Sequence, residues 1–348
     1  MSFDNHILFL TPGFPKDQTD FNCIPPLQEF LLQFKITFPT VEISVITFQY
    51  PYHKNNYKWN AISVYPLGGE NSKLNKIFVW LKCLKTAMSI NKISSINIIH
   101  SLWLGECAML GAILSKRFNC LHICTLMGQD VKKSNRYLRI LKYTKYTIVA
   151  LSNNQAEQFF NITSRNVDDI IHWGIEDQHF TLSERDIDLL AVGSLIPLKN
   201  YSLFVKIIAN LVKNGVDIRA VLVGDGPQRA ELEELAHEFG VITNIEFRGL
   251  LNREDIFKLM QRSKIFVHPS LFEGSGYVFA EALGNGMNIV SFNVGYAQNN
   301  PKWFIVKDEE EFIKTLKKLL NNKLDFSPAN IFPLKETIKR YASVYGIN

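Results

Sequence analysis

The clearest signal for the fold is the stretch of residues 189–226, LLAVGSLIPLKNYSLFVKIIANLVKNGVDIRAVLVGDG. They contain an apolar run over 189–195, a helical pattern over 201–215 and a second apolar run over 219–226. Two apolar strands joined by a helix indicate a parallel βαβ unit, whose strands are covered on both faces. The pattern continues with a helix over 228–240, strands over 244–249, 265–270 and 288–294, and a helix over 309–322.

The first half of the chain has the same alternation. Strands are expected over 6–11, 42–48, 96–103, 121–127, 146–152 and 169–173, and helices include 25–34 and 105–118. The stretch 174–188 is polar, breaks the periodicity and predicts a linker. We therefore predict an α/β protein of two Rossmann-like, doubly wound parallel-sheet domains facing a central cleft. The predicted parts are 1–178, 186–325 and a C-terminal helix over 326–348 that returns toward the N-terminal domain.

The composition is typical of a soluble globular protein. The 348 residues suffice for two domains, and 47% are apolar and 20% charged. The opening MSFDNHILFL carries an acid and only a short apolar run, so no signal peptide is expected and the protein is placed in the cytoplasm. The five cysteines form no CxxC pair and are expected to be reduced and mostly buried.

Positive charge is concentrated in the first half. Residues 1–150 hold 17 Lys and Arg against 8 Asp and Glu, and the remainder holds 21 against 25. In the helical stretch 72–89, a stripe is expected in the core, leaving Phe78, Lys82 and Lys85 outward; the stripe is Leu74, Ile77, Leu81, Leu84 and Met88. Residues 131–145 add six cations. Two readings stay open: a peripheral contact with an anionic membrane at its inner face, and a merely solvated basic face. No nucleic-acid partner is expected.

The stretch FEGSGYVFAEALGNG, residues 272–286, predicts an anion site. Glycines at 274 and 276 let the backbone approach a diphosphate at a helix start, and Lys199 could supply a cation. Glu281 is expected to accept ribose hydroxyls, and Glu273 to order the hydroxyls of a sugar. The alternatives are an exposed helix glutamate for Glu281, a dipole-stabilising acid for Glu273 and a solvated loop lysine for Lys199.

A rival reading starts from Gly224 and Gly226, which follow a strand as in a dinucleotide fingerprint. Arg229 stands where the third glycine belongs, which disfavours a nicotinamide site. No His or Cys cluster has metal-ligand spacing, so no metal is expected. No pattern of Ser, His and Asp residues indicates a catalytic triad.

The sequence resembles, in the order and spacing of five segments, the retaining nucleotide-sugar glycosyltransferases of the GT-B fold, specifically glycosyltransferase family 4. The segments are VGSLIPLKN, VLVGDGPQRAELEEL, IEFRGLL, HPSLFEGSGYVFAEALGNG and the closing KRYASVYG. The resemblance covers nearly the whole chain and is densest over 189–295. It implies that Lys199 holds the donor diphosphate, that the backbone of 275–277 caps it, and that no metal is needed. It also implies a phosphate-approaching loop at TPGFP, residues 11–15. TLMGQD, residues 125–130, matches the family's donor-sugar motif at Gly128 and Asp130.

Two departures from the family pattern concern the donor. Ser194 replaces an arginine that usually contacts phosphate, and Met127 replaces a histidine that usually meets the donor sugar. Arg229 or Lys132 could compensate for the lost cation.

The resemblance implies a metal-independent, retaining, hexosyltransferase-type enzyme acting on a saccharide or lipid-linked acceptor, in surface polysaccharide or glycolipid synthesis. The leaving phosphate would take the acceptor's proton, so no protein base is needed. The residues expected in catalysis are Glu273, Lys199, Asp130 and His100, the last with an alternative role in packing. The residues expected to bind the donor are Gly13, Lys199, Gly224, Gly226, Arg229, Gly274, Ser275, Gly276, Tyr277 and Glu281. A nucleotide-sugar epimerase and a weakened nucleotide-sugar binder on the same scaffold are the alternatives.

Overall fold

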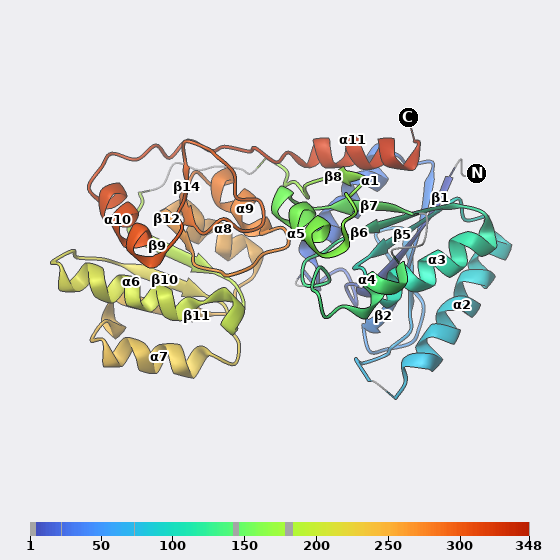
Figure 1. The fold of residues 1–348 in the computed structure, drawn as a ribbon, viewed down its shortest axis with the longest axis horizontal. Helices are drawn as coiled ribbons and strands as arrows, with labels where there is room; N and C mark the ends of the chain where they lie inside the picture. The colour runs from blue at the N-terminus through green and yellow to red at the C-terminus, as the bar shows by residue number, and fades with distance from the viewer. Residues whose placement is uncertain (1–4, 22, 73, 142–145, 178–183, 348) are drawn as a thin grey trace. The chain divides into compact units, whose positions relative to one another are not determined.

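The computed structural model describes residues 5–21, 23–72, 74–141, 146–177 and 184–347 (Figure 1). The chain divides into two compact units. Unit 1 comprises residues 1–173 and 334–348, and unit 2 comprises residues 174–333. Both units are parallel α/β structures, which confirms the predicted fold class.

Unit 1 contains an eight-stranded sheet in the order β3-β4-β2-β1-β5-β6-β7-β8. The strands are β1 (Asn5–Gly13), β2 (Val41–Tyr50), β3 (Tyr57–Trp59), β4 (Ile62–Pro66), β5 (Ile98–Leu102), β6 (Leu121–Thr125), β7 (Thr147–Ala150) and β8 (Asp169–Ile170). Among the strand pairs of this sheet that the described residues form, only β3–β4 is antiparallel. This hairpin was absent from the predicted strands. The chain order reverses between β1 and β5, which makes their carboxyl ends a topological switch point.

Helices cover both faces of this sheet. The helices of unit 1 are α1 (Pro25–Thr37), α2 (Lys76–Ile93), α3 (Glu106–Phe118), α4 (Arg136–Leu141), α5 (Asn153–Thr163) and α11 (Leu334–Tyr345). Side chains of α2 and α3 pack with β1, β2 and β5 in one apolar cluster. On another part of the sheet, α1 and α11 close over an aromatic cluster in which Phe30 contacts Phe9 and Tyr341. The last helix is therefore part of unit 1.

The prediction for α2 was wrong for the stripe expected in the core, whereas Phe78 and Lys85 are exposed as expected. The buried residues of this helix are Val79, Cys83, Ala87 and Ile90. The stripe expected in the core is largely exposed: Leu74, Ile77, Leu81 and Met88 have relative exposures of 91%, 65%, 51% and 40%. An apolar surface of this helix therefore faces outward.

Unit 2 contains a six-stranded, wholly parallel sheet in the order β11-β10-β9-β12-β13-β14. The strands are β9 (Ile187–Val192), β10 (Ala220–Val223), β11 (Ile245–Gly249), β12 (Ser263–His268), β13 (Asn288–Ser291) and β14 (Trp303–Ile305). The helices are α6 (Tyr201–Lys213), α7 (Arg229–Glu238), α8 (Arg253–Arg262), α9 (Tyr277–Gly284) and α10 (Glu309–Leu320). Helices α6, α7 and α10 share one apolar core with the central strands. In this sheet the chain order reverses between β9 and β12, which marks the expected place of a ligand.

The two ends of unit 2 lie beside each other. Ile175 forms a bridge with Pro333, and the N–H of Ile175 donates to the carbonyl of Phe332 at 2.9 Å. At Gly174, a Cβ atom would lie 2.4 Å from that same carbonyl oxygen, so the two segments approach more closely than a side chain would permit. Of the predicted linker over 174–188, residues 178–183 lie outside the described residues. Within the ranges described, none of the helices has the length and hydropathy needed to cross a membrane.

Candidate functional site

The site of unit 2 lies at the carboxyl ends of β9 and β12. These strands pair directly, with Leu189 opposite Ile265. The loops that follow them are joined by backbone: the N–H of Leu271 donates to the carbonyl of Leu198 at 3.0 Å, and the hydroxyl of Ser270 donates to the same carbonyl at 3.2 Å. The two loops are thereby held together at the switch point.

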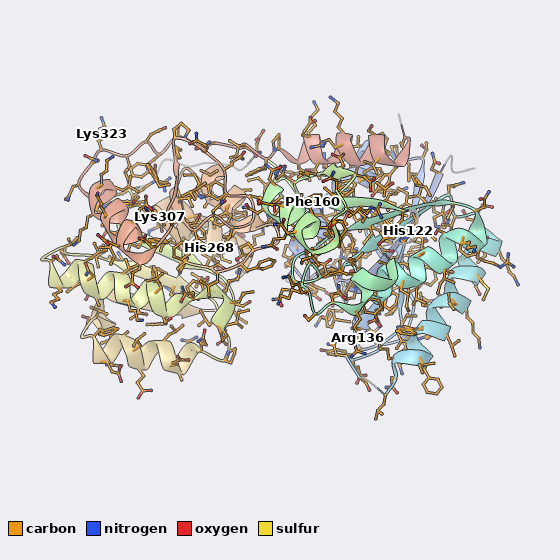
Figure 2. All side chains as sticks on the ribbon, in the orientation of Figure 1. His122, Arg136, Phe160, His268, Lys307 and Lys323 are labelled. Atoms are coloured by element: carbon orange, nitrogen blue, oxygen red, sulfur yellow. The ribbon has the colours of Figure 1, made fainter. Side chains whose placement is uncertain are left out.

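These loops bring Lys199 and Glu273 into contact. Lys199 ends a single 3-10 turn, Pro197–Lys199, and its ammonium Nζ pairs with Glu273 Oε1. His268, the last residue of β12, places Nε2 at 2.7 Å from the same oxygen. We call Lys199, His268 and Glu273 the Glu273 cluster. The relative exposures of the three side chains are 19%, 0% and 12%, so a charged group is held at the end of the sheet with little water around it (Figure 2 labels His268).

The protonation of the Glu273 cluster follows from this geometry. Burial alone would raise the pKa of Glu273, but the hydrogen bond from His268 and the positive charge of Lys199 lower that pKa to about 2. Burial lowers the pKa of His268, against the attraction of Glu273. At neutral pH the cluster therefore contains an ionised carboxylate and a neutral imidazole, and Glu273 is unsuited to act as a general acid.

Two buried polar atoms beside the cluster lack hydrogen-bond partners among the described residues. They are the hydroxyl of Tyr201 and Nδ1 of His268. The Tyr201 hydroxyl lies under Gly193, where a Cβ atom would be 2.6 Å from it. Unsatisfied buried polar groups are uncommon and mark strained or functional positions.

The glycine turn after Glu273 leads directly into α9. Gly276 adopts the left-handed conformation with φ of 71° immediately before α9, and no side chain caps that helix start among the residues described. The carbonyl of Ser275 accepts the N–H of Tyr296 at 2.8 Å, and Gly295 lies so near that a Cβ atom would be 2.4 Å from that oxygen. The turn is thus fixed against the loop after β13, with Gly274, Ser275, Gly276 and Tyr277 in sequence along it.

Glu281 belongs to a separate ion pair. Its carboxylate accepts a hydrogen bond from Arg253 Nε at 2.9 Å, and its side chain is 12% exposed. The Arg253 guanidinium lies 5.6 Å from the centroid of the Tyr277 ring. Burial raises the pKa of Glu281, partly offset by Arg253. Glu281 is therefore not the exposed helix glutamate of the alternative reading, and each of the two acids has its own cation.

Gly224 and Gly226 have a role in packing. A Cβ atom at Gly224 would lie 1.9 Å from the carbonyl oxygen of Gly193, and one at Gly226 would lie 2.5 Å from that of Leu195. The N–H of Leu195 also donates to the carbonyl of Asp225 at 2.9 Å. These glycines allow the loop after β10 to press on the loop that leads to Lys199.

The proposed substitute cations have other partners. Arg229 donates from Nε to Glu233 at 2.9 Å, and Lys132 donates to Gln129 at 3.0 Å on the surface of unit 1. Ser194 is exposed and Met127 is half-buried.

The three predicted residues of unit 1 are largely internal. Gly13 ends β1 and is buried beside Cys23. Asp130 accepts the N–H groups of Leu104 and Gly128, each at 2.8 Å, so it organises the loop after β6.

His100 is fully buried. Its Nδ1 lies 2.6 Å from the Tyr345 hydroxyl and its Nε2 lies 2.8 Å from that of Thr125. Burial lowers its pKa to about 3. The packing role fits this side chain, and contact with a sugar does not.

Sequence reasoning missed His268, Arg253 and Tyr201. A signal existed for His268, because it ends the apolar run of β12. Arg253 opens α8, a helix that was not predicted. Among the described residues, no three His, Cys, Asp or Glu side chains are grouped in a way that could hold a metal ion.

Comparisons with known proteins fit this architecture. Residues 175–342 match the family model Glycosyl transferases group 1. An uncharacterized glycosyltransferase of Methanocaldococcus jannaschii is 25% identical over 265 residues, which are 73% of this chain and 71% of that protein. The phosphatidylinositol N-acetylglucosaminyltransferase gpi3 subunit of Schizosaccharomyces pombe is 25% identical over 143 residues, and this match spans only 31% of that protein's length.

Solved structures show the same fold over the whole chain. The Anabaena protein HepE in complex with UDP and glucose has a TM-score of 0.74 at 15% identity, covering 98% of this chain and 99% of that one. A sucrose-phosphate synthase from Thermosynechococcus elongatus also has a TM-score of 0.74, at 16% identity, covering 99% and 95%. The chain therefore has the fold of the GT-B glycosyltransferases, and the segment that contains the Glu273 cluster matches the group 1 family model.

Proposed function

We propose that this protein is a retaining, metal-independent glycosyltransferase that moves a sugar from a nucleoside diphosphate sugar to a saccharide or lipid-linked acceptor. The observation that carries the proposal is the Glu273 cluster at the switch point of unit 2, beside the glycine turn that opens α9. A solved relative of the same fold holds UDP and glucose, and curated relatives include a 2-deoxystreptamine glucosyltransferase.

Each part of the site has a place in this reaction. The start of α9 carries the positive end of its helix dipole, and Lys199 adds a cation for the diphosphate. The donor would displace Glu273 from part of its contact with Lys199 and leave the carboxylate to accept sugar hydroxyls. The ion pair with Arg253 would orient Glu281 toward the ribose.

In the reaction, the bond between the anomeric carbon and the phosphate oxygen breaks while the acceptor oxygen bonds to that carbon on the same face. The acceptor's proton passes to the departing phosphate oxygen, so the nucleoside diphosphate is the proton acceptor. The protein stabilises the charge that develops on the diphosphate and holds donor and acceptor together on the same face of the transferred sugar. A carboxylate that stays ionised at neutral pH suits the second task better than proton transfer.

A panel of UDP-, GDP- and ADP-sugars tests the proposal. Slow hydrolysis of one donor is expected, and a suitable acceptor should accelerate its consumption. Conversion of the sugar with the nucleotide intact would instead indicate an epimerase. Binding without turnover would indicate a weakened nucleotide-sugar binder, the second candidate that Ser194 and Met127 favour.

Calorimetry with the free nucleotide tests the site. Lys199→Met and Glu281→Gln are each expected to weaken binding about tenfold or more, since each removes one charged contact. Lys206→Met, on the exposed surface of α6, is the matched control and should leave the affinity unchanged. Equal affinities in all four proteins would contradict the site.

A further inference from the structure

The outward surface of α2 carries large apolar side chains. Leu74, just before the helix, and Ile77, Phe78 and Leu81 within it have relative exposures of 91%, 65%, 72% and 51%. These positions recur at intervals of three and four, so they lie along one side of the helix. The buried residues of α2 lie on the opposite side. We call this outward side the α2 face.

The α2 face is also basic. No Asp or Glu occurs between residues 71 and 105, whereas five lysines do. Lys85 and Lys92 are exposed and fall on the α2 face by the same helical spacing. The α2 face therefore begins with four apolar side chains and continues with two lysines, and no acid lies among them.

A groove borders the start of the α2 face. It has a volume of about 180 Å³, and its lining includes Lys54, Asn75, Phe78 and Lys82. Burial lowers the pKa of Lys82, and the positive charge of Lys54 lowers it further. Because both lysines line this groove, it has the positive charge that would suit an anion.

Cations of the neighbouring segment extend the positive surface. The Lys76 ammonium lies 5.6 Å from the centroid of the Tyr137 ring, which places the start of α4 beside the start of α2. The exposed cations next to it are Lys132, Lys133 and Arg136, the last labelled in Figure 2.

We propose that the α2 face lies on the surface of an anionic lipid bilayer. Leu74, Ile77, Phe78 and Leu81 would enter the boundary between headgroups and acyl chains. The surrounding lysines would contact lipid phosphates, with Lys54 and Lys82 on either side of one phosphate. A helix that combines an apolar side with lysines and lies in the membrane plane has this composition.

The positive charge of the α2 face favours an anionic bilayer over a protein partner. Protein interfaces are depleted of lysine at their centres, whereas here lysines share one helix side with the apolar side chains. A second copy of the chain would bring these lysines against one another in a symmetric contact. The contact concerns binding alone and holds whether or not the proposed transfer occurs.

Vesicle flotation of the full chain tests the contact. We expect binding to phosphatidylcholine vesicles that contain about one third phosphatidylglycerol at low salt, weak binding to phosphatidylcholine alone, and release of most of the protein near 1 M salt. Equal binding to both vesicle types, or none to either, would overturn the proposal.

Matched variants locate the surface. Phe78→Ser combined with Leu81→Ser should weaken partitioning at least tenfold. Lys82→Glu combined with Lys85→Glu should also weaken it at least tenfold, since a lysine near such a surface contributes about fivefold. The controls are Ile36→Ser, at a site 70% exposed on α1, and Lys116→Glu on the exposed surface of α3; both should bind within about twofold of wild type.

Retention of binding by both double variants would overturn the assignment to α2. Sedimentation of the wild type as a dimer that the Phe78→Ser and Leu81→Ser variant abolishes would assign the α2 face to a second copy instead. Calorimetry of the same variants with nucleotide keeps the two proposals separate. Nucleotide binding without vesicle binding would contradict only the bilayer contact of the α2 face. Vesicle binding without nucleotide binding would contradict only the proposed sugar transfer.

Discussion

Replacing Glu273 by glutamine should change how stability depends on pH. The carboxylate has a pKa of about 2 in the folded protein against an ordinary value of 4.5. This difference corresponds to about 3 kcal/mol of stability, present in full above pH 4.5 and lost as the pH falls toward 2. Between pH 7 and about pH 3, roughly 2 kcal/mol of it should disappear from the wild type. Glu273→Gln removes the ionisable group and should flatten this part of the profile.

Urea denaturation of the full chain, followed by circular dichroism at several pH values, measures this slope. At pH 7 the variant should be less stable by up to about 3 kcal/mol, with the difference shrinking on acidification. Glu254→Gln is the matched control, because that carboxylate is 80% exposed and its pairing with Lys258 contributes little. A variant with the wild-type slope, or a control that shifts as much, would refute the electrostatic description of the Glu273 cluster.

Two further predictions concern packing and a buried imidazole. Gly224→Ala should destabilise the protein by about 2 to 4 kcal/mol and move the Lys199 loop, because the new methyl group would clash with the carbonyl of Gly193. At Gly13 a methyl group would make only ordinary contacts, so Gly13→Ala should cost under about 1 kcal/mol, and the urea midpoints of the two variants test the difference. Burial lowers the pKa of His122 to about 3 from an ordinary 6.5, so the stability that His122 contributes is complete above pH 6.5 and falls on acidification. In urea denaturation, His122→Gln should remove about 3 kcal/mol of the stability that the protein loses between pH 7 and about pH 4.

The sequence was informative wherever apolar runs were buried on both sides. β10 lies within the predicted strand 219–226, and β9 begins two residues before the predicted run 189–195 and overlaps it, because a central parallel strand requires such an apolar run. The β3–β4 hairpin gave no comparable signal. Its two-residue turn consists of Asn60 and Ala61, both with positive φ, in place of the glycine-containing pair that usually marks such turns.

Helix α2 shows where periodicity is ambiguous. Both of its sides are apolar, and the larger side chains were assigned to the core. The sheet and α3 instead accept the smaller set that includes Cys83 and Ala87. Which side packs depends on the space available against neighbouring elements, and the helix's own sequence does not contain that information.

The candidate site was predictable as a set of residue types but not as a set of contacts. Lys199 was singled out because it follows a strand, and Glu273 because it precedes a glycine-rich turn at a helix start. Their contact depends on β9 pairing with β12, and strand order is not a local property of the chain. His268 contacts Glu273 and Arg253 pairs with Glu281, and both roles become recognisable only once the strand order is known.

The bridge between Ile175 and Pro333 makes unit 2 a closed insertion within unit 1. In unit 1, the hydroxyl of Thr337 donates to the carbonyl of His172 at 2.8 Å, so the points where the chain leaves and re-enters this unit are also neighbours. Segments whose termini meet can be excised or rejoined with few added residues. The molecule therefore has a natural place for engineering: residue 173 could be spliced to 334 by a short linker, and residues 174–333 could be grafted as a cassette into a related scaffold.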